Sequence, residues 1–143
     1  MKKGFESIFS EIQSDMVAIC LEYIEDKGDK IYIYASYEDK IITCDFFYQV
    51  NGVIYHNHEL PKGYDVSIER QKSCMEILID DMEQMITVCS EYEADMPTEI
   101  KMIYDINTNQ LNASYQYDEI YTNTDKFAND IVEEWYQEIC SQL

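Results

Sequence analysis

The chain has 143 residues, a length at which one domain buries most of its apolar surface without disulfides or metals. With 46% hydrophobic residues and only 4 Gly and 2 Pro, its composition excludes a disordered chain. The net charge of −19, from 29 acidic and 10 basic residues, disfavours binding to nucleic acid or to an anionic membrane. A cationic partner is the natural complement, and acidity that serves only solubility is the simpler alternative.

No apolar segment approaches the ~20 residues that a membrane span needs, and the first residues lack the apolar core of a signal peptide. A cytoplasmic location is therefore expected. The five cysteines stand at long, irregular intervals without a CxxC pair, so neither a disulfide framework nor a zinc site is indicated. We expect buried thiols that behave as small hydrophobic side chains.

Apolar residues at three- and four-residue steps predict an amphipathic first helix over about residues 4–25. Its stripe consists of Phe5, Ile8, Phe9, Ile12, Met16, Ile19, Cys20 and Tyr23. The helix should end before Asp26, and Gly28 suits the left-handed conformation that often follows a helix. Such a helix needs an apolar surface to pack on, and we expect a sheet to provide it.

Three strands are predicted to follow this helix. Residues 30–36 and 41–49 are rich in β-branched and aromatic side chains, and a turn over residues 37–40 joins them. The dipeptide Asn51-Gly52 supplies the two positive-φ positions of a type I′ turn, so residues 53–57 should fold back as a third strand. This dipeptide is the strongest local signal in the chain.

A second amphipathic helix is predicted over residues 68–92, with Asp65 or Ser67 as its cap. Its apolar stripe consists of Met75, Leu78, Met82, Met85, Ile86 and Cys89. The opposite face carries acidic residues over ~33 Å, which we call the acidic row: Glu69, Glu76, Asp80, Glu83 and Glu91. No Lys or Arg occurs between Ser73 and Ile100 to neutralise it. We interpret the acidic row as the candidate recognition surface, with a plain solvated face as the alternative.

Two further strands and a last helix complete the predicted fold. Residues 98–104 and 111–117 should form a hairpin, and a helix over about residues 125–141 follows. The apolar stripe of this helix consists of Ala128, Ile131, Val132, Trp135 and Ile139. Alternating apolar and polar residues in 111–117 indicate a sheet with one packed and one wet face. We therefore predict a single α+β domain over residues 1–143, in the order α-β-β-β-α-β-β-α, with an antiparallel sheet and its helices packed on one face.

Several short motifs occur in a characteristic order. The first helix is followed by the strand Lys30–Ala35, with sequence KIYIYA. The segment Pro61–Ser67, with sequence PKGYDVS, precedes the long acidic helix, and Tyr115–Asp118, with sequence YQYD, ends the last strand. In this order and spacing, over about residues 5–121, the chain resembles the YezG/EsaG-like immunity (antitoxin) family of Gram-positive bacteria. Family members often carry Trp where this chain has Gly28-Asp29 and Pro97-Thr98, so it resembles a divergent member.

The resemblance implies a protein that binds and neutralises a cognate secreted polymorphic toxin. In that family the toxin is typically a nuclease exported by a type VII secretion system. The implied partner is therefore a toxin protein with a basic surface, and the acidic row is its candidate contact. The resemblance implies no catalytic residues and no cofactor, and it leaves the identity of the toxin open.

Two other classes of function are weighed against this one. His56 and His58, with Glu59 beside them, could form part of a metal site and serve a small metal-assisted hydrolase. Spacing identifies no third ligand, no local signature marks a nucleophilic cysteine, and four scattered glycines cannot build a phosphate loop. We therefore predict no enzyme, no metal and no cofactor. An acidic cytoplasmic adaptor or chaperone is the third possibility.

Overall fold

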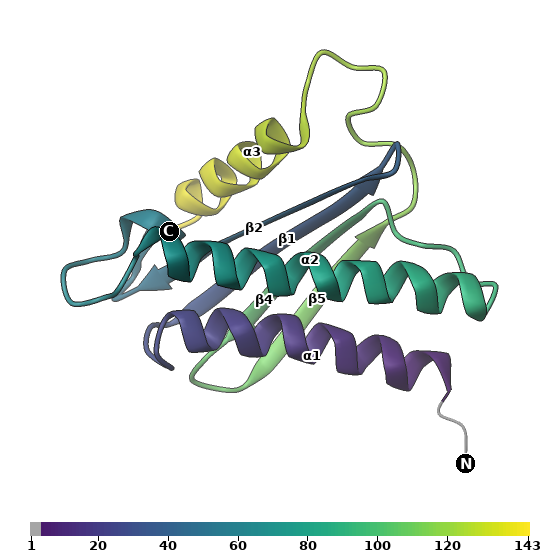
Figure 1. Cartoon of the computed structure of the whole chain (residues 1–143). Helices are drawn as coiled ribbons and strands as arrows, with labels where there is room; N and C mark the ends of the chain where they lie inside the picture. The colour runs from purple at the N-terminus through teal and green to yellow at the C-terminus, as the bar shows by residue number, and fades with distance from the viewer. Residues whose placement is uncertain (1–3) are drawn as a thin grey trace.

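The fold is seen in a computed structural model that describes residues 4–143 (Figure 1). In chain order its elements are α1 (Phe5–Tyr23), β1 (Lys30–Glu38), β2 (Ile41–Val50), β3 (Val53–His56), the 3-10 helix η1 (Asn57–Glu59), α2 (Ile68–Glu91), β4 (Glu99–Asp105), β5 (Gln110–Gln116) and α3 (Ala128–Ser141). Every predicted helix and strand is present in the predicted order. The α+β class is therefore confirmed. Each helix within residues 4–143 is too short or too polar to cross a membrane.

The strands form one antiparallel sheet in the order β3-β2-β1-β4-β5. β1 lies at the centre, and it pairs with β2 through a hairpin and with β4 after the chain has crossed back along α2. Because β1 has a strand on both sides and helices over both of its faces, all its residues except Lys30 and Tyr37 are buried. The sheet is thus organised around β1, with the short β3 and the longer β5 as its two edges.

The two faces of β1 point into two separate cores. Ile31 and Ile33 pack against α1 and α2, whereas Tyr32 and Tyr34 pack against α3. The prediction that all helices pack on one face is therefore wrong, because α3 covers the face opposite α1 and α2 (Figure 1). Trp135 is the core anchor that the sequence indicates, at 5% exposed, but its partners are the aromatic residues of this second face.

α1 and α2 lie side by side across the first face of the sheet (Figure 1). Met16 from α1 and Leu78, Met82 and Met85 from α2 are fully buried there. Each side chain of this kind contributes ~1.5–3 kcal/mol when it is removed from water. This burial holds α2 as a straight, packed scaffold with one face turned to solvent.

The Asn51-Gly52 turn is confirmed, since both residues have positive φ, at 50° and 79°. The turn between β1 and β2 is tighter than predicted. Asp39 and Lys40 alone form it, with φ of 51° and 63°, so the strands extend into the predicted four-residue turn. A pair of left-handed residues therefore makes each of these two hairpins.

The end of α1 differs from the prediction, which placed Gly28 in the left-handed position that follows the helix. Glu25 and Asp26 are the left-handed residues that follow the helix, with φ of 57° and 60°. Their N–H groups donate to the carbonyl oxygens of Glu22 and Leu21, which satisfies the last turn. Gly28 also has positive φ, at 97°. There the absence of a Cβ atom lets the chain pass close to β2.

The segment 117–127 carries the chain from β5 past the end of the sheet to α3 (Figure 1). The side chain of Glu38, at the end of β1 and 4% exposed, anchors this segment. Its carboxylate accepts hydrogen bonds from the N–H groups of Ile120, at 2.9 Å, and Thr122, at 3.1 Å, and from the Thr122 hydroxyl at 2.7 Å. Burial alone would raise the pKa of Glu38, but these hydrogen bonds together lower it. The anchor is therefore ionised at neutral pH.

Candidate functional site

The acidic row lies on the outer side of α2, and all five of its side chains are exposed. Ser67 caps this helix as predicted, because its hydroxyl accepts a hydrogen bond from the N–H of Arg70. Among residues 4–143, none of the five carboxylates forms an ion pair with a Lys or Arg. The row is therefore a line of exposed charge without an ion pair among the described residues, and its members repel one another. Lys72 is a cationic residue within a helical turn of it, near Glu69 and Glu76.

Arg70, the one arginine in the sequence, makes its contacts away from the acidic row. The Arg70 guanidinium donates to the carbonyl oxygens of Asp65, at 3.0 Å, and Glu22, at 3.1 Å, and lies 5.2 Å from the centre of the Tyr23 ring. It therefore ties the start of α2 to the end of α1. Glu69 lines a hollow beside this arginine, so it stands apart from the rest of the row.

The C-terminal half of the row surrounds a separate, shallow hollow on α2. Three of its members line this hollow together with Gln84, Thr87 and Val88, namely Asp80, Glu83 and Glu91. Val88 is half-buried and packs against the core below. The hollow thus has carboxylates at its rim and an apolar floor, an arrangement that can hold the stem and charge of a basic side chain.

Sequence reasoning missed a buried acid next to this surface. Asp81 is 3% exposed at the boundary between α1 and α2, and its Oδ2 has no hydrogen-bond partner among the described residues. Burial, and then the neighbouring Asp15 and Asp80 carboxylates, raise the pKa of Asp81 to about 8. Asp81 therefore keeps a proton at neutral pH that it can donate to Asp15. In the sequence, the burial of Asp81 was indicated only by its position between the core residues Leu78 and Met82.

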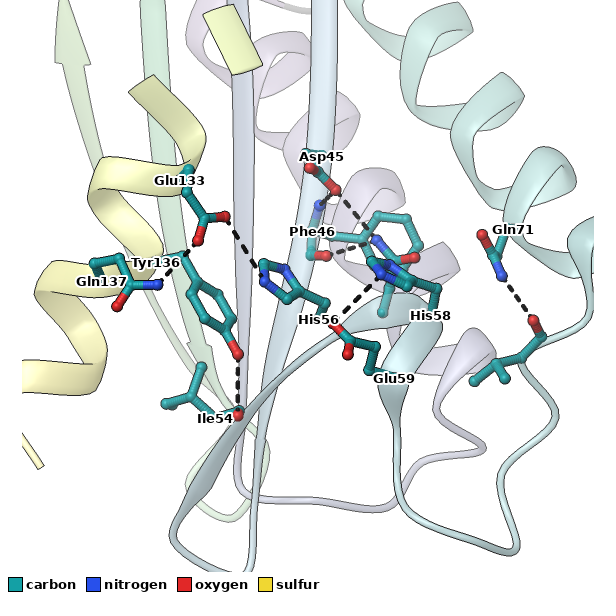
Figure 2. Close-up of polar contacts among 12 residues, drawn as sticks. Asp45, Phe46, Ile54, His56, His58, Glu59, Gln71, Glu133, Tyr136 and Gln137 are labelled. Carbon is teal, nitrogen blue, oxygen red and sulfur yellow. Dashed lines mark hydrogen bonds and ion pairs between the residues drawn. The ribbon is translucent and has the colours of Figure 1, made fainter. Parts of the chain in front are cut away.

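The two histidines form a second polar cluster, at the end of β3 and in η1 (Figure 2). Their rings stack with centroids 5.5 Å apart, and each faces its own carboxylate. The Nε2 atom of His56 lies 3.7 Å from Glu133 on α3, and that of His58 lies 3.4 Å from Glu59. His56 also stacks on Tyr136 at 3.7 Å. Within residues 4–143, no group of three His, Cys, Asp or Glu side chains is placed to hold a metal ion.

The cysteines lie where small hydrophobic residues would. Cys20, Cys44, Cys74 and Cys89 are buried, Cys140 is half-buried, and all five are free thiols. Burial raises the pKa of Cys44 to about 12 and that of Cys20 well above its usual value. Thiols held in the protonated form are poor nucleophiles, so these side chains serve packing.

A packed α+β scaffold that presents a rigid, exposed acidic helix fits a protein that acts by binding another protein. A family model described as "Immunity protein YezG-like" matches residues 5–139, nearly the whole chain. The chain belongs to the YezG-like immunity protein family, and the resemblance seen in its motifs is confirmed. No curated protein matches the chain. Family membership supports an immunity role and implies a cognate toxin as the partner.

Proposed function

We propose that the protein neutralises a nuclease toxin, exported by a type VII secretion system, by binding it in the cytoplasm of the producing cell through the acidic row. The observation that carries this proposal is the line of exposed carboxylates on α2 without an ion pair among the described residues. Nucleases hold polyanions with Lys and Arg, so their substrate-binding surface is cationic. A helix with carboxylates at fixed spacing competes for that surface in place of the phosphates.

The charge and the hollow on α2 have different expected roles. Unscreened charges steer the two proteins together and raise the association rate, an effect that salt weakens. Contacts in the hollow around Val88 form only after docking, and they limit dissociation. Raising the salt concentration from ~50 to ~500 mM should therefore slow association and leave dissociation less affected.

The test begins with the gene directly beside the one for this chain, which should encode a toxin with a secretion domain and a nuclease-like C-terminal domain. That C-terminal domain is purified, and its association with the immunity protein is measured by stopped-flow fluorescence. A variant carrying Glu76→Lys, Asp80→Lys and Glu83→Lys should associate at least ~10-fold more slowly. Circular dichroism checks that its fold is intact.

A matched control separates the position of the charge from its amount. The variant Asp125→Lys, Glu134→Lys and Glu138→Lys changes the net charge equally, at exposed sites on or before α3 on the other side of the sheet. It should associate at close to the wild-type rate. If the α2 variant also binds at the wild-type rate at low salt, the acidic row is not the contact, although the immunity role stands.

A further inference from the structure

The two edges of the sheet are protected to different degrees. β3 has only four residues, and the Tyr136 hydroxyl donates a hydrogen bond to the carbonyl oxygen of Ile54 at 3.2 Å. His56, at the end of β3, is covered by the Tyr136 ring. By contrast, β5 has seven residues and pairs with β4 along its whole length without a bulge. Among residues 4–143, no strand lies on its outer side.

β5 also lacks the features by which natural edge strands avoid pairing with other chains. Such edges usually carry charged residues, Pro or bulges. The β5 sequence QLNASYQ contains no charged residue and no Pro, although 27% of the whole chain is charged. Because one side of β5 bonds to β4, the alternate N–H and C=O groups on the other side are free to accept a further strand.

A groove runs beside the C-terminal end of this edge, between α1, β5 and the loop after α2. Four aromatic residues line it, together with Ser10, Gln13 and Ala94; we call it the aromatic groove, formed by Phe5, Phe9, Tyr115 and Tyr117. The Phe9 and Tyr115 rings lie 5.8 Å apart, and the Gln13 side-chain amide donates to the Tyr115 hydroxyl. Tyr117 is 57% exposed. The groove is thus lined by aromatic side chains at the end of an open strand.

The walls of the aromatic groove are acidic. Glu6 and Asp95 line it and are exposed, and within residues 4–143 neither forms an ion pair. A Lys or Arg side chain fits such a site, because its apolar stem can lie on the rings while its charge reaches the carboxylates. An acidic side chain would be repelled by the same walls. The groove therefore selects a basic occupant.

We propose that β5 accepts an extended, basic segment of the partner protein as an additional strand, with a Lys or Arg side chain in the aromatic groove. This inference rests on the proposed function, because the segment would belong to the toxin. In this mode of recognition, main-chain hydrogen bonds supply affinity and side-chain pockets supply specificity. A second copy of the chain is a poorer occupant, since two molecules with a net charge of −19 repel each other.

The β5 edge and the acidic row are different surfaces. α1 contacts β5 through Phe9, whereas α2 packs mainly over β2. The two surfaces come nearest at the end of α2, where Asp95 of the groove follows Glu91 of the acidic row by four residues. The acidic row would attract a cationic partner and speed its association. The β5 edge would then form main-chain hydrogen bonds with one segment of that partner. The two contacts can therefore be tested one at a time.

The first experiment uses a short fluorescein-labelled peptide of alternating Lys and Val as the probe, with binding followed by fluorescence anisotropy at ~150 mM salt. Amide NMR signals of residues 110–117 should shift when the peptide binds. A second peptide with alternate backbone amides N-methylated keeps the charge but loses strand pairing, and it should bind at least ~10-fold more weakly. Equal affinity of the two peptides, or shifts confined to α2, would overturn the proposal.

Variants then test the aromatic groove. Glu6→Gln with Asp95→Asn keeps the side-chain shapes and should weaken binding of the Lys peptide by ~10-fold. The control Glu138→Gln with Asp125→Asn removes the same charge at exposed sites on or before α3 and should leave the affinity close to wild type. Equal weakening by both double variants would show that only net charge matters and would refute the groove. Sedimentation that shows a dimer with protected β5 amides would identify a second copy as the occupant and also refute the proposal.

Hydrogen exchange in the complex with the toxin domain distinguishes this inference from the proposed function. Amides of β5 should exchange at least ~10-fold more slowly in the complex, while those of β3 should not change. Protection on α2 without protection on β5 would leave the proposed function standing and refute the strand addition. Protection on β5 with a wild-type association rate for the α2 charge-reversal variant would support the strand addition and refute the acidic row as the contact.

Discussion

The two faces of the sheet are covered in different ways. The first face, covered by α1 and α2, holds methionine, isoleucine, leucine and cysteine side chains together with the buried aromatic residues Tyr23, Phe46 and Tyr48. The second face has α3 alone, whose Trp135 stands against Tyr32 and Phe47 with ring centroids 5.9 and 5.1 Å apart. The first core is broad and mixes aliphatic with aromatic side chains, whereas the second core is small and mostly aromatic.

This difference divides the second face into a closed and an open half. α3 packs over β2 and β3, whereas Asn112, Ser114 and Gln116 of β5 are exposed on the same face. A protein that acts by binding needs both a stable scaffold and uncovered surface. The comparison therefore indicates that α1 and α2 provide most of the stability. α3 covers only the half of the second face that lies over β2 and β3.

Removal of the aromatic anchor should give the largest effect. Trp135→Ala deletes the centre of the small core and should lower the free energy of unfolding by ~3–5 kcal/mol. Urea denaturation measures this change. Phe127→Ala, next to the same helix but 75% exposed, is the control and should stay within ~0.5 kcal/mol of wild type. A wild-type midpoint for Trp135→Ala would show that α3 contributes nothing to the second face.

Asp81→Asn tests the one buried acid in the contact between α1 and α2. The folded protein holds a proton on Asp81 up to a pKa of about 8, whereas the unfolded chain releases it near pH ~4. Wild-type stability should therefore fall as the pH rises from ~4 to ~8 and then level off. Asn needs no proton and can still donate a hydrogen bond to Asp15, so the variant should be more stable at pH 7 by ~1–3 kcal/mol.

An exposed acid on the same helix provides the control for this prediction. Glu76→Gln removes a charge that does not contribute to the pKa of Asp81, and its unfolding midpoint should follow the wild-type pH dependence. Thermal unfolding at several pH values compares the three proteins. If Asp81→Asn retains the wild-type loss of stability with rising pH, the buried acid is not its source.

Gly52→Val should give the smallest of these effects. Gly52 has a φ of 79° and no atom within 4 Å of an added Cβ, so substitution there costs backbone strain without a steric clash. We expect destabilisation of ~1 kcal/mol or more, seen as a lower melting temperature. Gly52→Asn should be milder, because Asn tolerates positive φ. An unchanged melting temperature for the Val variant would contradict the turn assignment.

Local signals in the sequence predicted the elements but not how the helices divide between the faces. The 3.6-residue period located α1 and α2, and the Asn51-Gly52 pair located a hairpin, because both depend on near neighbours. The alternation in β5 indicated one wet face, which is true of β5 at the open half. Residues 31–35 of β1 are all buried, and such a continuous apolar run is typical of a strand covered on both faces. Extending the β5 pattern to the whole sheet therefore misplaced α3.

The acidic row was predictable from the sequence because it depends only on near neighbours within one helix. The contacts around it were not predictable. Helical projection places each member of the acidic row on the solvent side without knowledge of the tertiary fold. The helical period places Asp81 on the apolar stripe, three residues after Leu78 and four before Met85, but its contact with Asp15 depends on α1. The openness of β5 depends on the order of the strands. Glu38 likewise gains its partners from a distant segment. Contacts of this kind leave no periodic signal in the sequence.

The anchoring of segment 117–127 by Glu38 has a consequence for the order of folding. Glu38 and Thr122 are separated by 84 positions, so their hydrogen bonds close a long loop. The pairing of β1 with β4 closes a shorter loop, since its most distant partners are Lys30 and Asp105. The hairpins and helix turns close much shorter ones. We therefore expect α3 to dock last, after the sheet and the two-helix face have formed. Trp135 is the only tryptophan in the chain, so its fluorescence during refolding reports this closing step directly.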